Sequence, residues 1–181
     1  GYVEWVLADL RPKSGMHVLT EIDAATGALF ARNPYNNEFA DRTAFFDVDA
    51  LSRSVSGDRA EFLGRNGSMQ APAALTRAQL SGRVGAGLDA CAAIQVPLEL
   101  YPNAETEVIF RMGLAGRRGA EDARSLLQKY RGSDAAQSAL TAVHEHWTRV
   151  LSGVQVETPD AALNVLSNGW LLYQTLACRV W

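Results

Sequence analysis

Short runs of alternating apolar and polar residues fill the first two thirds of the chain. A period of two places neighbouring side chains on opposite faces of a strand, so each run predicts a half-buried strand. Residues 23–27 have the composition of a hairpin turn. The expected strands lie at residues 2–7, 16–21, 28–32, 43–48, 93–100 and 105–112, the last two paired through a turn at 101–104. Several short strands separated by Gly, Pro and Asn favour an antiparallel β-sandwich.

The hydrophobic period becomes helical after Gly116. One helix is expected at residues 120–130. A second is predicted to open at Asp134, where Gln137 completes a capping box, and to end before Gly153. Its apolar stripe consists of Leu140, Val143, Trp147, Val150 and Leu151.

A third helix is predicted to open at residues 158–160, with Thr158 as the N-cap, Pro159 at the first helical position and Asp160 as a first-turn acid. Its apolar residues form two faces: Leu163, Leu166, Trp170, Tyr173 and Ala177, and Val165, Leu172 and Leu176. A helix that is apolar on several faces is normally enclosed by other helices. Because two short preceding helices are too few to enclose it, we expect further helices beyond Trp181 or from a partner.

Composition and charge exclude several classes of protein. Of the 181 residues, 48% are hydrophobic and 20% are charged, which is typical of a globular protein and excludes a disordered tail. The net charge of -3 provides no basic field for a polyanion, so we expect no nucleic-acid partner. Neither a membrane-spanning apolar stretch nor a signal peptide is visible in these 181 residues, and for a fragment this says nothing of its parent.

Both ends of the chain fall inside an expected secondary-structure element. The chain opens inside an expected strand, its first methionine is Met16, and it closes on an apolar helix at Trp181. We therefore expect a fragment of a longer protein. The two cysteines, Cys91 and Cys178, lack metal-ligand spacing and are expected to be reduced, buried and structural.

Three histidines raise the question of a metal site. His144 and His146 flank Glu145, but residues two apart on a helix point about 200° away from each other, so they cannot grip one ion. His17 has no recognisable Cys or His partner in the sequence. All three histidines are interpreted as solvated residues, and no metal ligands are predicted.

Two further patterns also favour ordinary structural explanations. The glycines at 82–87 lack the lysine of a phosphate loop and the strand–helix context of a dinucleotide site, which favours a long loop with unusual backbone angles. Asp47 and Asp49 share one face of an expected strand, as an acid–base pair would. Exposed acids at a strand end explain them equally well.

The stretch at residues 58–68 ends in a polar loop that contains Arg65 and Asn66. A guanidinium and an amide are suited to hydrogen bonding with sugar hydroxyls or a phosphate. An exposed arginine in an ordinary turn is the alternative interpretation. These two residues are the candidate substrate contacts of the chain.

Several sequence blocks, in order and spacing, carry a family resemblance. They occupy residues 17–23, 32–36, 38–42, 44–48, 61–67, 88–95 and 170–181. Together they resemble the C-terminal glycoside-phosphorylase-like region of cyclic β-1,2-glucan synthases, in glycoside hydrolase family ninety-four. Cellobiose and chitobiose phosphorylases are more distant relatives. The resemblance extends over nearly the whole chain.

This resemblance implies an α+β fold. Residues 1–115 would be the later part of an antiparallel β-sandwich that belongs to a supersandwich. Residues 116–153 would be a helical linker, and residues 154–181 would contain the first helix of a truncated α/α-barrel. The rest of the barrel would then enclose the third helix.

The resemblance also implies a function for a longer parent protein. Its reaction would be phosphorolysis or glycosyl transfer at β-glucosidic bonds with inversion, with inorganic phosphate as co-substrate and no other cofactor. The family's catalytic aspartate would lie beyond Trp181, so no catalytic residue is expected within the chain.

The expected partners are a β-glucan oligosaccharide, the missing barrel and a second copy in a homodimer. The fragment is expected to be soluble on the cytoplasmic side, and its bacterial parent to associate with the inner membrane. A carbohydrate-binding module and a dimerisation domain are the alternative functions.

Overall fold

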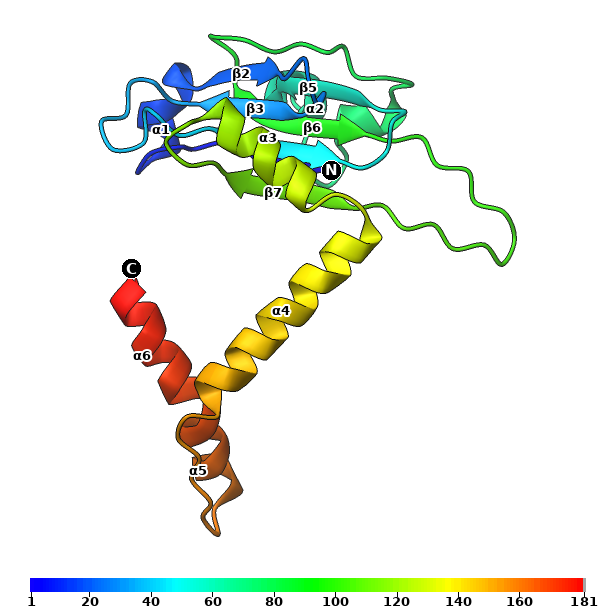
Figure 1. Ribbon diagram of the computed structural model, residues 1–181. Coiled ribbons are helices and arrows are strands. Elements are labelled where there is room, and N and C mark those ends of the chain that lie inside the picture. Colours follow the sequence, from blue (N-terminus) through cyan, green and yellow to red (C-terminus); the bar gives the residue numbers. More distant parts are fainter. Residues whose placement is uncertain (181) are drawn as a thin grey trace. The chain divides into compact units, whose positions relative to one another are not determined.

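The computed structural model describes residues 1–180, so the predicted end of the third helix at Trp181 lies outside the described residues. The chain divides into one compact unit at Gly1–Ser133 and a second that begins at Asp134. Two antiparallel β-sheets form the first unit, and helices form the second (Figure 1). The predicted α+β class is confirmed.

The first unit contains a three-stranded and a four-stranded sheet (Figure 1). The smaller sheet has the order β1-β6-β5, formed by Tyr2–Glu4, Ala90–Gln95 and Ser54–Asp58. The larger has the order β2-β3-β4-β7, formed by Leu19–Ile22, Leu29–Arg32, Ala44–Val48 and Phe110–Leu114. The turn between β2 and β3 is the predicted hairpin, closed by Gly27 N–H donating to the Asp23 carbonyl at 2.7 Å.

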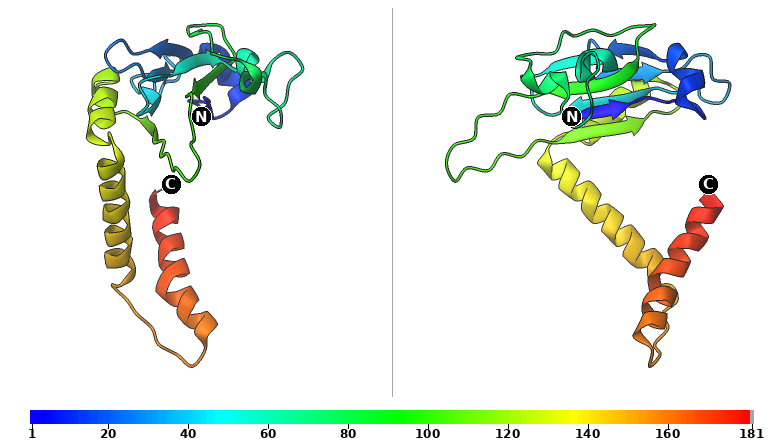
Figure 2. Two further views of the ribbon diagram at one scale, coloured as in Figure 1. Left: turned by 90° about the vertical axis from the view of Figure 1, so that its right-hand side faces the viewer. Right: turned by 180° about the vertical axis from the view of Figure 1, so that it is seen from behind.

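Apolar side chains from both sheets pack between them. Ala44, Phe46 and Val48 point into this core from β4, and Ala92 and Ile94 reach it from β6. The outer face of the four-stranded sheet is covered by α3, Ala120–Lys129 (Figure 1). The outer face of the three-stranded sheet is covered by α2, Arg59–Leu63, and by the 3-10 turn η2, Ala73–Thr76 (Figure 2).

The predicted hairpin between residues 93–100 and 105–112 is wrong. β6 pairs with β1 and β5, whereas β7 pairs with β4 in the other sheet. Alternation reports which residues face a core, but it carries no information about the partner strand. β5 was not predicted, since its sequence Ser-Val-Ser-Gly-Asp has one large apolar residue.

The strand predicted at residues 16–21 begins only at Leu19. The residues before it form α1, Arg11–Ser14, and the 3-10 turn η1, Gly15–His17. β1 likewise ends at Glu4, short of the predicted end at residue 7, and Leu7 itself adopts φ 46°, in the left-handed region that no strand residue occupies.

The second unit begins within α4, Ser133–Leu151, and continues with α5, Ala161–Val165, a π-helical turn η3, Leu166–Trp170, and α6, Leu171–Val180. Asp134 lies in the first turn of α4 instead of preceding it, so its predicted role as the cap is wrong. Within this unit the Trp147 ring lies 5.7 Å from the Tyr173 ring between centroids.

The start of the third predicted helix is also shifted. Asp160 is its N-cap and accepts hydrogen bonds from the amides of Ala162 and Leu163, at 2.8 and 3.4 Å. Thr158 instead fixes the preceding turn, its hydroxyl donating to Asn164 Oδ1 at 2.7 Å. Asp160 is the N-cap in place of Thr158 because its carboxylate accepts hydrogen bonds from two helix amides.

The cysteines differ in their surroundings. Both are free thiols, and Cys91 is buried as predicted, but Cys178 is exposed on α6. Within the described residues, no helix is long and apolar enough to cross a membrane.

Candidate functional site

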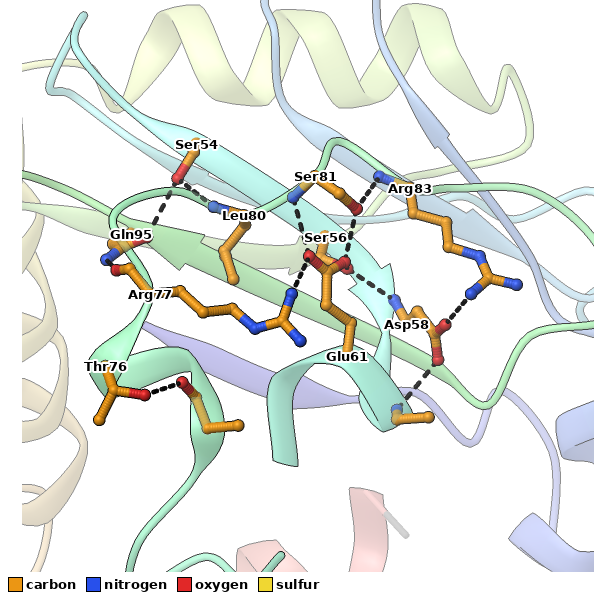
Figure 3. A network of polar contacts seen from close by, with 12 residues as sticks. Ser54, Ser56, Asp58, Glu61, Thr76, Arg77, Leu80, Ser81, Arg83 and Gln95 are labelled. Atoms are coloured by element: carbon orange, nitrogen blue, oxygen red, sulfur yellow. Dashed lines mark hydrogen bonds and ion pairs between the residues drawn. The ribbon is translucent and has the colours of Figure 1, made fainter. Parts of the chain in front are cut away.

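A polar network fixes α2, the helix that precedes the predicted substrate contacts (Figure 3). Asp58 caps α2 by accepting a hydrogen bond from the Ala60 amide at 2.9 Å. Glu61 accepts from Ser56 Oγ at 2.6 Å and from the Ser81 amide and hydroxyl at 2.9 and 2.7 Å. Burial opposes ionisation of Glu61, but these hydrogen bonds outweigh it and hold the pKa of the carboxyl below its ordinary value.

Arg65 and Asn66 lie in the turn that follows α2, and both are exposed. Gly64 ends the helix at φ 83°, and Asn66 has φ 60°, a conformation that asparagine tolerates better than most residues. Gly67 packs so closely on the Leu63 carbonyl that a Cβ would collide with it. The turn is thus tightly defined and presents both side chains to solvent.

Asp47 and Asp49 belong to an ion cluster, so the interpretation as exposed strand-end acids is wrong for Asp47. Asp47 is buried and pairs with Arg53 at 2.8 Å and Arg111 at 2.6 Å. Asp49 contacts the same Arg111 at 2.6 Å and accepts a hydrogen bond from the Gly132 amide at 2.8 Å. The sequence distance between β4 and β7 concealed the shared partner Arg111. Both acids are engaged in holding β4, β7 and the end of α3 together.

The glycine-rich segment at residues 82–87 is a loop, as predicted. Gly82, Gly85 and Gly87 all have positive φ, at 75°, 135° and 71°. The loop follows β5 and β2: Gly57 donates to the Arg83 carbonyl at 2.7 Å, and Thr20 donates to the Gly85 carbonyl at 3.2 Å. Two of its amides are engaged in the same way, since Gly82 N–H donates to the Val55 carbonyl at 2.8 Å and Gly85 N–H donates to Thr20 Oγ1 at 3.1 Å. The loop backbone therefore extends the sheets.

The histidines are distributed over two separate sites. His144 and His146 are exposed on α4, as predicted. Among residues 1–180, no group of three His, Cys, Asp or Glu side chains is arranged to hold a metal ion. His17, by contrast, is half-buried and stacks on Tyr35, with ring centroids 4.2 Å apart and an angle of 17° between the planes.

The stacked His17 and Tyr35 belong to a polar cleft of about 340 Å³. One wall is formed by the residues before α1 and by α1 and η1; the other is formed by the loop between β3 and β4. The cleft is lined by Ala8, Asp9, Leu10, Lys13, Ser14, His17, Asn33, Tyr35, Asn36, Asn37 and Glu38.

Asn33 connects the two walls of this cleft. It is buried, its Nδ2 donates to the Leu7 carbonyl at 3.2 Å, and its Oδ1 accepts from the Tyr35 amide at 3.1 Å. Asn36 Oδ1 accepts from the amides of Glu38 and Phe39, at 2.9 and 2.8 Å. The loop that presents Tyr35 is therefore held by side chain–backbone hydrogen bonds.

This cleft was missed because it combines residues whose individual signals are weak. The sequence holds one signal for the cleft: His17, Asn33 and Tyr35 all lie in blocks that carry the family resemblance. The sequence did not show that η1 replaces the expected strand and turns His17 toward Tyr35.

A family model described as "Glycosyl hydrolase 94, supersandwich domain" matches residues 1–133. The chain belongs to this family. The resemblance inferred from the sequence blocks is thereby confirmed, together with the supersandwich fold. The matched range coincides with the first compact unit, Gly1–Ser133.

Curated relatives of this GH94 chain are enzymes of much greater length. It is 38% identical over 181 residues to cyclic beta-(1,2)-glucan synthase NdvB of Rhizobium meliloti, an alignment that covers 99% of the chain and 6% of the relative. It is 26% identical over 189 residues to N,N'-diacetylchitobiose phosphorylase of Vibrio furnissii, covering 100% of the chain and 23% of the relative. The chain thus spans less than a quarter of each.

Proposed function

We propose that this chain is the non-catalytic sandwich-and-linker part of an enzyme that acts on β-1,2-glucan. The observation that carries the proposal is the 38% identity to a cyclic beta-(1,2)-glucan synthase over 99% of the chain. The whole protein performs inverting phosphorolysis or glycosyl transfer, and inorganic phosphate is the co-substrate of the phosphorolytic direction. Its general acid is an aspartate outside this chain.

The state of the buried carboxylates supports a non-catalytic role. A glycosidic general acid needs a raised pKa so that it holds a proton near neutral pH. Burial opposes the ionisation of Asp23, but hydrogen bonds from Arg124 and Thr26 hold its pKa below the ordinary value, and Glu61 is shifted in the same direction. Asp47 is held between two arginines. These groups are committed to the fold.

Arg65 and Asn66 are proposed to contact the glucan at the edge of the whole protein's site. Their exposure on a defined turn supports this role, since a guanidinium and an amide together supply donors and an acceptor to hydroxyl groups.

The proposed homodimer is supported by an apolar surface on β7. Phe110, Met112 and Leu114 are 42%, 65% and 50% exposed on one face of this strand. A row of exposed apolar residues of this kind is typical of an interaction surface.

A domain exchange tests the proposed function. The segment of the Rhizobium meliloti synthase that aligns with this chain is replaced by it, and cyclic glucan formation is measured on the purified protein. We expect glucan synthesis, because the fold and the surfaces of the segment are retained. The control carries the matching segment of the Vibrio furnissii phosphorylase. A folded but inactive exchange protein, with an active control, would contradict the proposal.

The non-catalytic part of the proposal has its own test. The 181-residue chain is incubated with β-1,2-glucan and inorganic phosphate, and glucose 1-phosphate is measured with a coupled enzyme assay. We expect none to form. Formation of glucose 1-phosphate by the chain alone would overturn this part.

A further inference from the structure

We propose that the cleft between α1 and the β3–β4 loop binds a neutral saccharide, with Tyr35 as the stacking platform. That the saccharide is a β-linked glucan rests on the proposed function; that the cleft suits a sugar rests on its own geometry. The volume of about 340 Å³ falls in the range of roughly 300–1,000 Å³ found for small-ligand sites.

The platform is an exposed aromatic ring that is nevertheless held in place. Tyr35 is 74% exposed, yet it stacks on His17 with 4.2 Å between the ring centroids. The face of an aromatic ring carries partial negative charge, which attracts the C–H groups on the flat side of a pyranose. A ring fixed before binding loses little conformational freedom when the sugar arrives.

Charged groups beside the platform are free to bind hydroxyl groups. Asp9, Lys13 and Glu38 line the cleft, and none of the ion pairs among residues 1–180 involves them. Their neighbour Arg11, in contrast, pairs with both Glu4 and Asp89. A carboxylate accepts and an ammonium donates hydrogen bonds, so together they match hydroxyls that do both.

The charge balance of the cleft selects against an anion. Two carboxylates, Asp9 and Glu38, stand beside one ammonium, Lys13. A phosphate or an acidic sugar would meet net repulsion there, whereas a neutral saccharide would not. This distinguishes the cleft from the turn of Arg65 and Asn66, which offers a cation.

Backbone strain at the cleft supports a functional role for its shape. Leu7 has φ 46°, a left-handed conformation that is unfavourable for a residue with a branched side chain and persists only where its surroundings impose it. The buried Asn33 accounts for that constraint through its hydrogen bond to the Leu7 carbonyl. The same asparagine accepts from the Tyr35 amide, so it links the strained residue that precedes one wall to the loop that carries Tyr35 on the other.

The experiment is a titration of the ¹⁵N-labelled 181-residue chain with a linear β-1,2-linked gluco-oligosaccharide, followed by amide NMR shifts. We expect the shifts to cluster at α1, η1 and the β3–β4 loop. The Tyr35→Ala variant should bind about tenfold more weakly, and Tyr35→Phe should retain binding, because stacking is the dominant contact. Tyr101→Ala is the matched control, since Tyr101 is 69% exposed on another loop and its loss should leave affinity unchanged.

Three results would overturn the inference. They are equal affinity of the Tyr35→Ala variant and the unaltered chain, shifts that cluster at Arg65 instead of Tyr35, and no binding at millimolar saccharide. Any of these obtained alongside an active exchange protein would remove the cleft and leave the proposed function in place. Tyr35-dependent binding together with an inactive exchange protein would support the saccharide site and contradict the proposed function alone.

Discussion

The side-chain amide of Asn33 donates a hydrogen bond to the carbonyl oxygen of Leu7 at 3.2 Å, joining two segments that lie 26 residues apart in sequence. Leu7 has positive φ, and Asn33 is buried with its second polar atom on the Tyr35 amide. One side chain thus fixes both the end of the β1 segment and the loop after β3.

Removing that side chain should destabilise the first unit. The Asn33→Ala variant leaves a carbonyl and an amide without their partner, which costs about 1–3 kcal/mol of unfolding free energy. The measurement is urea denaturation followed by far-ultraviolet circular dichroism. Asn37→Ala is the control, because Asn37 is exposed in the same loop, and its midpoint should not change. Equal losses in the two variants would contradict the assigned role.

Substitution in the buried ion cluster should lower the free energy of unfolding by more than substitution in a surface ion pair. Asp47→Ala removes the carboxylate that pairs with both Arg53 and Arg111, and Arg111 remains largely buried with reduced compensation. Breaking a buried pair from one side costs about 3–5 kcal/mol.

The matched control for this cluster is Asp41→Ala. Asp41 is 49% exposed and makes two long pairs, with Arg117 (84% exposed) at 3.8 Å and with Arg42 (34% exposed) at 3.7 Å. Surface pairs of this kind each contribute about 0–1 kcal/mol. Both variants are compared by urea denaturation at neutral pH. A loss below about 1 kcal/mol for Asp47→Ala would show that the cluster does not hold the sheet to α3.

These residues also show what the sequence could and could not predict. The β2–β3 hairpin was predictable because its turn chemistry is local: Asp23 Oδ2 accepts from the Thr26 amide three residues later. The partner of β7 was not, since β4 and β7 are separated by more than 60 residues and the contact between Asp47 and Arg111 exists only in the fold.

The same difference between local and long-range contacts decides how much of the candidate site the sequence predicts. The polar loop of Arg65 and Asn66 is predictable from the sequence because its turn residues are local. Its role as a substrate contact stays a prediction. The cleft at Tyr35 depends on His17 entering a 3-10 turn, which tertiary packing imposes against the alternating pattern of the sequence.

The pH dependence of stability should reflect Asp23 and Glu61. Both have pKa values lower in the folded chain than their ordinary values of 3.8 and 4.5, because hydrogen bonds favour the ionised form despite burial. Their contribution is therefore complete above those ordinary values and is lost as the pH falls through the lower, folded values.

We expect this loss to appear as a fall in the urea midpoint as the pH is lowered below the ordinary values of 4.5 and 3.8, with no contribution from these two groups to any change at higher pH. The double variant Asp23→Asn, Glu61→Gln should start less stable at neutral pH and should show a shallower fall. If the urea midpoint of the double variant falls with pH as steeply as that of the unaltered chain, other carboxyl groups cause the acid sensitivity.

The apolar face of β7 should be detectable in solution. Met112 pairs with Phe46 and Leu114 pairs with Ala44, so both side chains share the face that β4 directs into the core. They remain 65% and 50% exposed because the three-stranded sheet does not cover them.

The Met112→Thr, Leu114→Thr variant should bind less of the dye anilinonaphthalene sulfonate and aggregate less, as measured by fluorescence and light scattering. Leu51→Thr is the control: Leu51 is 89% exposed outside this face, and its replacement should leave dye binding unchanged. Equal dye binding by all three proteins would show that this face is not the accessible apolar surface.

The two thiols should differ strongly in reactivity. Burial raises the pKa of Cys91 to about 12, so it remains a protonated thiol at neutral pH, whereas Cys178 is exposed on α6. Because the thiolate is the reacting form and needs access to the reagent, dithiobis(nitrobenzoate) should modify Cys178 rapidly in the folded chain. Cys91 should react only after denaturant is added. The Cys178→Ser variant should lose the rapid phase and keep the slow one, and a rapid phase that survives this substitution would mean that the three-stranded sheet opens to solvent around Cys91.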